Sequence, residues 1–252
     1  MRIRLTVEYD GTNYAGWQRQ KNAVSVQEML ERSYYSACGE TVSITGAGRT
    51  DAGVHALAQV AHFDTNSTIP AEKISFAMNM YLPEDIRARR SEEAAEGFHA
   101  RFDAKGKTYR YTIHNGIHAP ALQRHTAAHV RGRLDVAAMR KAARYIIGTH
   151  DFACFCASGS EVKSTVRTVH SLGITEQFPL IHMDITGSGF LYHMARIITG
   201  TLIDTGHGKL SPKDMREIID GRDRNKAGAT APAQGLTLIA VYYTPNLTQT
   251  RV

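Results

Sequence analysis

Short segments that alternate apolar and polar residues, each followed by a segment with helical spacing, constrain the fold of this chain most strongly. Residues 3–9 have the period-two pattern of a half-buried strand, and residues 108–114 repeat it. Ser25 and Glu28 form an S-x-x-E capping box, which predicts a helix that ends at Gly39. The two halves of the chain therefore begin alike, with a strand and then a helix.

Further elements follow the same two patterns. We expect strands over 57–63, 167–174, 181–186 and 238–243, and helices from Pro70, from Asp135 to near Gly148, over 193–205, and from Ser211 to Gly221. Polar positions within the strands indicate sheet faces open to solvent, which favour antiparallel pairing. We predict an α+β protein of two halves, residues 1–105 and 106–252, that share one mostly antiparallel sheet.

The basic residues are distributed unevenly between these halves. The chain has a formal net charge of +6, of which residues 1–105 contribute −2 and residues 106–252 contribute +8. Such an imbalance is typical of a surface that faces a polyanion, in most cases nucleic acid. A surface charge that serves only solubility is the alternative that the charge count leaves open.

Several classes of protein are excluded by composition. No apolar run approaches the ~18 residues that a membrane-spanning helix needs, and the amino terminus lacks the pattern of an export signal. Cys38, Cys154 and Cys156 are too few and too irregular for a disulfide framework, so we expect reduced thiols and a cytoplasmic protein. The DFACFC segment that contains two of them is expected to be a strand, and neither it nor the twelve histidines has metal-site spacing.

The densest chemical signal is GAGRTDAGVHA at residues 46–56, which lies between two expected strands. Its glycines allow sharp turns and close approach to a ligand, yet it matches neither a Walker loop nor a dinucleotide-binding loop. Asp51 stands in this loop with Arg49 and His55 nearby, and a guanidinium favours an ionised carboxylate. A glycosidase generally uses two carboxyl groups, one as the nucleophile and one as the general acid, and this loop contains no second one. A single carboxylate suits a reaction that retains its leaving group.

This loop and other segments resemble the bacterial tRNA pseudouridine synthase A family. The other segments are VEYDGTNYAGWQRQ at 7–20, FHARFDAKGKTYRY at 98–111, GTHDFACF at 148–155, SGFLYHMARIITGTL at 188–202 and APAQGLTLIAVYY at 231–243. The resemblance implies two RRM-like halves with helices on one face of the sheet and a central RNA-binding cleft. It further implies a homodimer that isomerises uridine to pseudouridine at positions 38, 39 and 40 of the tRNA anticodon stem-loop, without cofactor or metal.

The resemblance also assigns roles to particular residues. Asp51 matches the catalytic aspartate, which either attacks the ribose or abstracts a sugar proton. Tyr109 matches the tyrosine that stacks on the target base, and Arg196 matches the arginine that forms an ion pair with the aspartate. Without the resemblance, Tyr109 is an ordinary inward-facing strand residue. Asp10 is a weaker catalytic candidate, since an Asp-Gly pair at a strand end is usually part of a turn.

Other residues are candidates for binding the RNA. Arg49, Thr50 and His55 of the loop would contact the flipped uridine or its neighbours. Candidates for the phosphate backbone are Arg19, Lys21, Arg131, Arg133, Arg222, Arg224 and Lys226, each of which is otherwise a solvated surface charge. Trp17 either stacks on RNA or packs in the core. The alternative function is a noncatalytic tRNA-binding or RNA-folding protein on the same scaffold.

Overall fold

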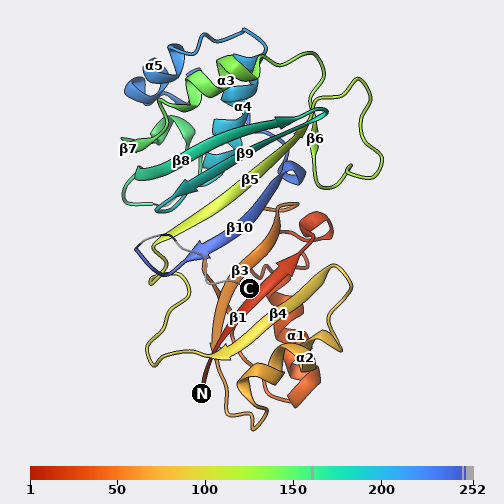
Figure 1. Cartoon of the computed structure of the whole chain (residues 1–252). Coiled ribbons are helices and arrows are strands. Elements are labelled where there is room, and N and C mark those ends of the chain that lie inside the picture. The colour runs from red at the N-terminus through yellow and green to blue at the C-terminus, as the bar shows by residue number, and fades with distance from the viewer. Residues whose placement is uncertain (160–161, 246, 248–252) are drawn as a thin grey trace. The chain divides into compact units, whose positions relative to one another are not determined.

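The structure is a computed structural model that describes residues 1–159, 162–245 and 247, and the chain divides into two compact units. The first unit begins with residues 1–105 and is completed by the chain from Thr237 onward. The second unit comprises residues 106–236. The last strand thus packs with the first unit, although the sequence division places it in the second half (Figure 1).

The first unit is built on paired strands and two α-helices. Its elements are β1 (Arg2–Tyr9), α1 (Val26–Cys38), β2 (Thr45–Gly46), β3 (His55–Asp64), α2 (Ile74–Asn79), β4 (Ile86–Glu93) and β10 (Leu236–Tyr242). The strand order is β4-β1-β3-β10, with β2 also paired to β3. β1 is antiparallel to both neighbours, whereas β10 runs parallel to the start of β3. The short β10 contact is this unit's exception to antiparallel pairing.

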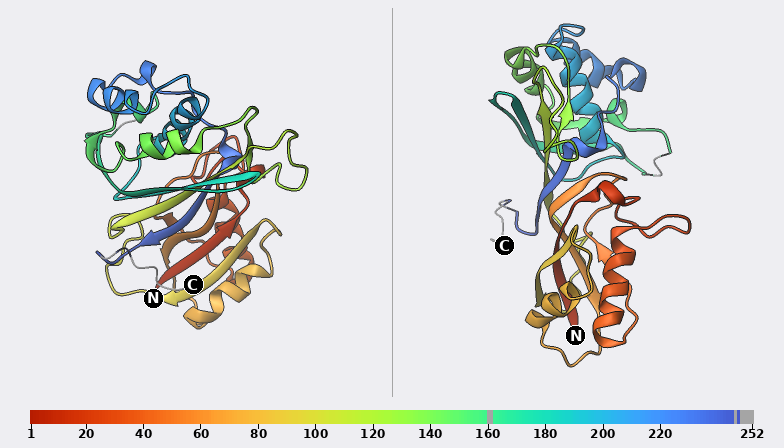
Figure 2. Two further views of the ribbon diagram at one scale, coloured as in Figure 1. Left: turned by 45° about the horizontal axis from the view of Figure 1, so that its top comes forward. Right: turned by 90° about the vertical axis from the view of Figure 1, so that its right-hand side faces the viewer.

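Helix α1 forms where the capping pattern predicts it. The Ser25 hydroxyl accepts a hydrogen bond from the Glu28 N–H at 3.3 Å, and Gly39 ends the helix with φ +74°. Such a left-handed residue at a helix end is most often glycine, which has no Cβ to clash. The helix covers one face of the sheet (Figure 2, right), and its Tyr34 ring packs edge-on against Phe63 of β3 with centroids 4.9 Å apart.

The second unit has the same kind of layers. Its elements are β5 (Gly106–His114), β6 (Ala128–His129), α3 (Val136–Ala143), β7 (Gly148–Asp151), β8 (Val166–Gln177), β9 (Leu180–Gly187), α4 (Met194–Gly206) and α5 (Asp214–Gly221). Strands β5, β9, β8 and β7 are antiparallel in that order, and β6 pairs parallel to β5. The three helices lie on one face of this sheet (Figure 2, right). The predicted α+β class, mostly antiparallel with helices on one face, is confirmed.

Two local predictions were wrong. The DFACFC segment is not a strand: residues 153–155 form a 3-10 turn that buries Cys154 and Phe155, and the Asp151 carboxylate accepts from the Ala153 N–H at 3.2 Å. The last helix begins at Asp214 and not at Ser211: the Asp214 N–H donates to the Ser211 carbonyl at 3.1 Å, which closes a turn over residues 211–214, and the Asp214 carboxylate accepts from the N–H and the hydroxyl of Ser211 as in a helix cap. In both places a local Asp contact shapes the backbone. No helix in the described part of the chain has the length and hydropathy to cross a bilayer.

Candidate active site

The Asp51 loop leaves β2 and enters β3. The Ala47 N–H donates to the Val60 carbonyl at 2.7 Å as the loop leaves β2, and the Val54 N–H donates to the Asp51 carbonyl at 3.1 Å. Asp51 is thus the first residue of a tight turn in which Gly53 adopts φ +77°, a conformation suited to glycine. The Asp51 side chain is half-buried at this turn, and the Arg49 side chain is exposed.

The opening motif of the chain holds this loop in place. The Trp17 N–H donates to the Thr50 carbonyl at 3.1 Å. Gly16 has φ +86°, and a Cβ on it would lie 2.4 Å from the same carbonyl oxygen. The Trp17 ring is buried over Gly46, where a Cβ would lie 2.5 Å from the ring. Packing, one of the two roles left open for Trp17, is therefore what the structure contains, and it joins the two sequence motifs.

His55 connects the loop to the turn after β1. Its ring is buried, and Nδ1 lies 3.0 Å from both the Gly11 N and the Asp10 Oδ1. The Gly11 amide can only donate, so Nδ1 acts as the acceptor of that hydrogen bond. The Asp10 carboxylate accepts from the Thr12 N–H at 3.0 Å. Through these contacts His55 and Asp10 stabilise the turn after β1.

Tyr109 and Arg196 belong to the second unit. Tyr109 lies on β5 opposite Ile185 of β9, and its ring meets Phe190 edge-on at a centroid distance of 5.0 Å. Arg196 lies in the first turn of α4, and its Nε donates to the Ala231 carbonyl at 2.8 Å. The Ala231 N–H in turn donates to the Arg196 carbonyl at 3.1 Å. The bond at Nε limits the directions in which the guanidinium points, and the backbone bond holds Ala231 against α4.

The candidate phosphate-binding residues fall into two groups. Arg19 forms an ion pair with Glu31 at 2.9 Å, Arg222 lies 3.4 Å from Asp151, and Arg224 donates to the Gly228 carbonyl at 3.0 Å. The second group consists of Lys21, Arg131, Arg133 and Lys226, whose side chains are exposed and form no side-chain hydrogen bond or ion pair within the described part of the chain. The second group is the better suited to bind phosphate.

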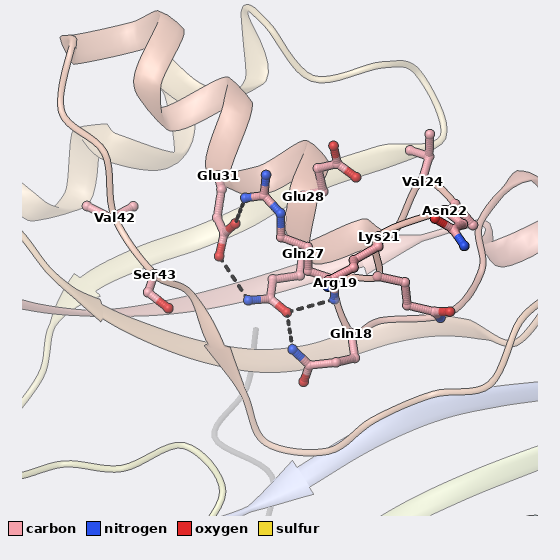
Figure 3. Close-up of a pocket in the computed structure, with 12 residues that line it drawn as sticks. Gln18, Arg19, Lys21, Asn22, Val24, Gln27, Glu28, Glu31, Val42 and Ser43 are labelled. Carbon is pink, nitrogen blue, oxygen red and sulfur yellow. Dashed lines mark hydrogen bonds and ion pairs between the residues drawn. The ribbon is translucent and has the colours of Figure 1, made fainter.

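A hollow of about 820 Å³ lies beside the loop that connects the opening motif to α1 (Figure 3). The Gln27 carboxamide organises its wall: Oε1 accepts from Gln18 Nε2 at 2.7 Å and from the Arg19 N–H at 3.0 Å, and Nε2 donates to Glu31 at 2.9 Å. Sequence reasoning did not single out Gln27 or Glu31. The available signal was a pair of polar residues four apart on α1, beside the apolar stripe.

The cysteines and histidines form no metal centre in the part of the chain that is described. No group of three or more His, Cys, Asp or Glu side chains there could hold a metal ion. Burial raises the pKa of the Cys154 thiol to about 12, so this sulfur is a poor nucleophile. Cys154 serves as a core residue.

Comparison with known proteins identifies the family of this chain. The family model of tRNA pseudouridine synthases matches residues 5–103 and 142–244. The chain is 54% identical over 243 residues to a tRNA pseudouridine synthase A of Ruminiclostridium cellulolyticum, covering 96% of this chain and 99% of the relative. It is 46% identical over 245 residues to the tRNA pseudouridine synthase A of Bacillus subtilis, with the same two coverages.

The chain belongs to the tRNA pseudouridine synthase family. It is therefore an enzyme of the isomerase class, a synthase of pseudouridine in tRNA, and the noncatalytic alternative is set aside.

Proposed function

We propose that this enzyme converts uridine to pseudouridine at positions 38, 39 and 40 of the tRNA anticodon stem-loop, with Asp51 as the catalytic carboxylate. The observation that carries the proposal is the turn at Asp51: its backbone is held by Val54 and its side chain is half-exposed. A fixed backbone with an accessible carboxylate is what attack on a bound ribose requires.

The reaction rearranges one nucleoside without adding or removing atoms. Asp51 attacks C1′ of the ribose and the bond to uracil N1 breaks, so the uracil departs as an anion that remains in the pocket. The base then turns, C5 joins C1′ as Asp51 leaves, and the C5 proton is lost while N1 gains one. No oxidant, reductant or second substrate is required, which is consistent with an enzyme that uses neither cofactor nor metal. A glycal route would instead have Asp51 abstract a sugar proton.

Tyr109 and Arg196 complete the proposed machinery. Tyr109 would stack on the target uracil, with its hydroxyl available for the proton at C5. Arg196 would pair with the Asp51 carboxylate and keep it ionised, because an adjacent opposite charge favours the charged form. The support for Arg196 is its reciprocal bonding with Ala231, which limits the directions in which the guanidinium points.

The target uridine must be turned out of its stack, at a cost of a few kcal/mol that other contacts offset. Arg49 is exposed beside Asp51 and would occupy the space that the base vacates, while Thr50 and His55 shape the loop around it. Residues 106–236 carry 17 basic and 10 acidic side chains, a net charge of +7, which supports a role in holding the RNA backbone. We further infer a cytoplasmic homodimer; light scattering on the purified protein tests the dimer.

The deciding experiment incubates the purified enzyme with unmodified tRNA and no cofactor, and then maps pseudouridine by position. Asp51→Ala and Asp51→Asn are expected to abolish the product while tRNA affinity stays within about threefold, because the carboxylate acts on the ribose and not on the phosphates. Asp64→Asn, a surface carboxylate paired with Arg2, is the matched control and should retain activity. Product at other tRNA positions, or turnover by Asp51→Ala, would refute the proposal.

A further inference from the structure

Three polar side chains from separate segments meet beneath the Asp51 loop. Tyr9 ends β1, Thr50 precedes Asp51, and Gln59 lies within β3; all three are buried. The Tyr9 hydroxyl and the Thr50 hydroxyl are 2.8 Å apart, and Gln59 Nε2 donates to the Gly48 carbonyl at 2.8 Å. The Gln59 side chain also interacts with the Tyr9 hydroxyl. The loop is thus held at two points, Gly48 and Thr50, on either side of Arg49.

The composition of this cluster is not what stability alone would favour. Gln59 has no exposed surface, and its Oε1 has no hydrogen-bond partner. A buried acceptor without a partner destabilises the folded protein, and an apolar side chain at this position would avoid that cost. What the amide provides is a donor to Gly48. Burial also raises the pKa of Tyr9, so its hydroxyl stays protonated and can bond to Thr50.

The same unit contains a second buried pair of the same chemistry. The Tyr34 hydroxyl of α1 bonds to the Thr65 hydroxyl, which also donates to Glu40. This pair connects α1 to the residue after β3, and the bond between its two hydroxyls involves no residue of the Asp51 loop. The two Tyr–Thr pairs therefore differ in what they support, which makes Tyr34 a matched control for Tyr9.

We propose that Tyr9, with Thr50 and Gln59, positions the Asp51 loop for catalysis, so that Tyr9 is a positioning residue of the isomerisation. This inference rests on the proposed role of Asp51. The hydroxyl of Tyr9 does not act on the substrate. It holds Thr50, and the backbone of Thr50 leads directly into Asp51.

The test compares Tyr9→Phe with Tyr34→Phe, each of which removes one hydroxyl and keeps the ring. Both should lower the melting temperature by similar amounts. Only Tyr9→Phe should lower kcat, by about tenfold or more, since small displacements of a reacting group are costly, and its KM for tRNA should remain within about twofold. An equal effect of the two variants on kcat would overturn the proposal.

A second comparison keeps the proposal testable if Tyr9→Phe folds poorly. Thr50→Ser retains the hydroxyl and Thr50→Val removes it, with little change of volume in the valine variant. The serine variant should have a kcat several times that of the valine variant; equal values would count against the proposal. Asp51→Ala is assayed in parallel. If Asp51→Ala is active, the proposed function fails; if it is inactive and both comparisons show no difference, only the positioning role fails.

Discussion

Gly200 of α4 lies so close to Ala229 that a Cβ on the glycine would stand 1.8 Å from the Ala229 carbonyl oxygen. The approach is mutual, because a Cβ on Gly228 would lie 2.6 Å from the Thr201 nitrogen, and the Gly228 N–H donates to the Thr201 hydroxyl at 2.9 Å. The loop that makes these contacts continues to Ala231, the residue that orients the Arg196 guanidinium. Two glycines thus allow the helix and the loop to form one support for Arg196.

Gly200→Ala should destabilise the protein and lower its activity. The added methyl cannot fit against the Ala229 backbone, and overpacking of this kind costs about 1–3 kcal/mol in free energy of unfolding. Urea denaturation and the assay on tRNA measure the two effects. Gly221→Ala is the control, because it lies at the end of α5 with nothing within 4 Å of the added Cβ. Equal stability of the two variants would contradict the close contact.

Gly16→Ala should impair the enzyme far more than Gly39→Ala. Both glycines have positive φ, +86° and +74°, so alanine suffers a strain of about 1–2 kcal/mol at either site. Only at Gly16 does the new methyl also collide with the Thr50 carbonyl. We therefore expect a loss of stability from strain in both variants, a further loss from the collision in Gly16→Ala, and a loss of kcat confined to Gly16→Ala. A normal kcat for that variant would show that the opening motif does not hold the Asp51 loop.

Arg133→Gln should reduce the salt dependence of tRNA binding. Each phosphate contact contributes roughly one unit to the slope of log affinity against log salt concentration, so the variant should lose about one unit. Lys209→Gln, which removes a cation paired with Asp204, should leave the slope as it is. Binding titrations over a range of potassium chloride concentrations measure both. A slope unchanged by Arg133→Gln would remove this residue from the phosphate-binding set.

His62→Gln should make stability less sensitive to mild acid. Burial, together with the nearby His99 and Arg2, lowers the pKa of His62 below its ordinary value of 6.5. As the pH falls below 6.5 the unfolded chain takes up a proton before the folded protein does, so stability decreases down to the folded-state pKa. In the wild type, His62 Nδ1 accepts a hydrogen bond from the Ala100 N–H at 3.2 Å. The glutamine side chain retains an acceptor for this N–H.

Melting temperatures at about pH 7.5 and about pH 5.5 test this expectation, because the two values lie on either side of the ordinary histidine pKa. The decrease on acidification should be smaller in His62→Gln than in the wild type. Replacement of the exposed His118 serves as the control. If both variants respond to acid as the wild type does, the burial of His62 has no influence on acid stability.

The local signals in the sequence predicted elements well where one residue decides the backbone. Ser25 and Gly39 are found at the two ends of α1, as expected, because a cap acts through neighbouring backbone groups. Strand β4 was not predicted: three arginines among its residues 86–93 obscure the alternation, and it forms because β1 supplies its hydrogen bonds. The helix expected from Pro70 is short: α2 begins at Ile74 and ends at Asn79, so Tyr81 beyond it is exposed.

The residues of the candidate site likewise fall into those that the sequence indicates and those that depend on the fold. Asp51, Arg49 and His55 could be proposed from the sequence because they share one short motif. Tyr9 and Gln59 could not, because they approach Thr50 only after β1 and β3 pair, and each has the appearance of an ordinary strand residue. The charges of Arg19 and Arg222 could be counted from the sequence, but their ion pairs with Glu31 and Asp151 depend on the fold.

The return of β10 to the first unit has a consequence for synthesis on the ribosome. Residues 106–236 are continuous and can fold as soon as they emerge, whereas the first unit waits for a strand encoded more than 130 residues after its other elements. Until then the start of β3 presents backbone groups without the partner that Thr237 and Leu238 provide. Such an open edge invites pairing with other chains. A nascent chain that stalls before residue 237 is thus a species that the cell has reason to shield or degrade.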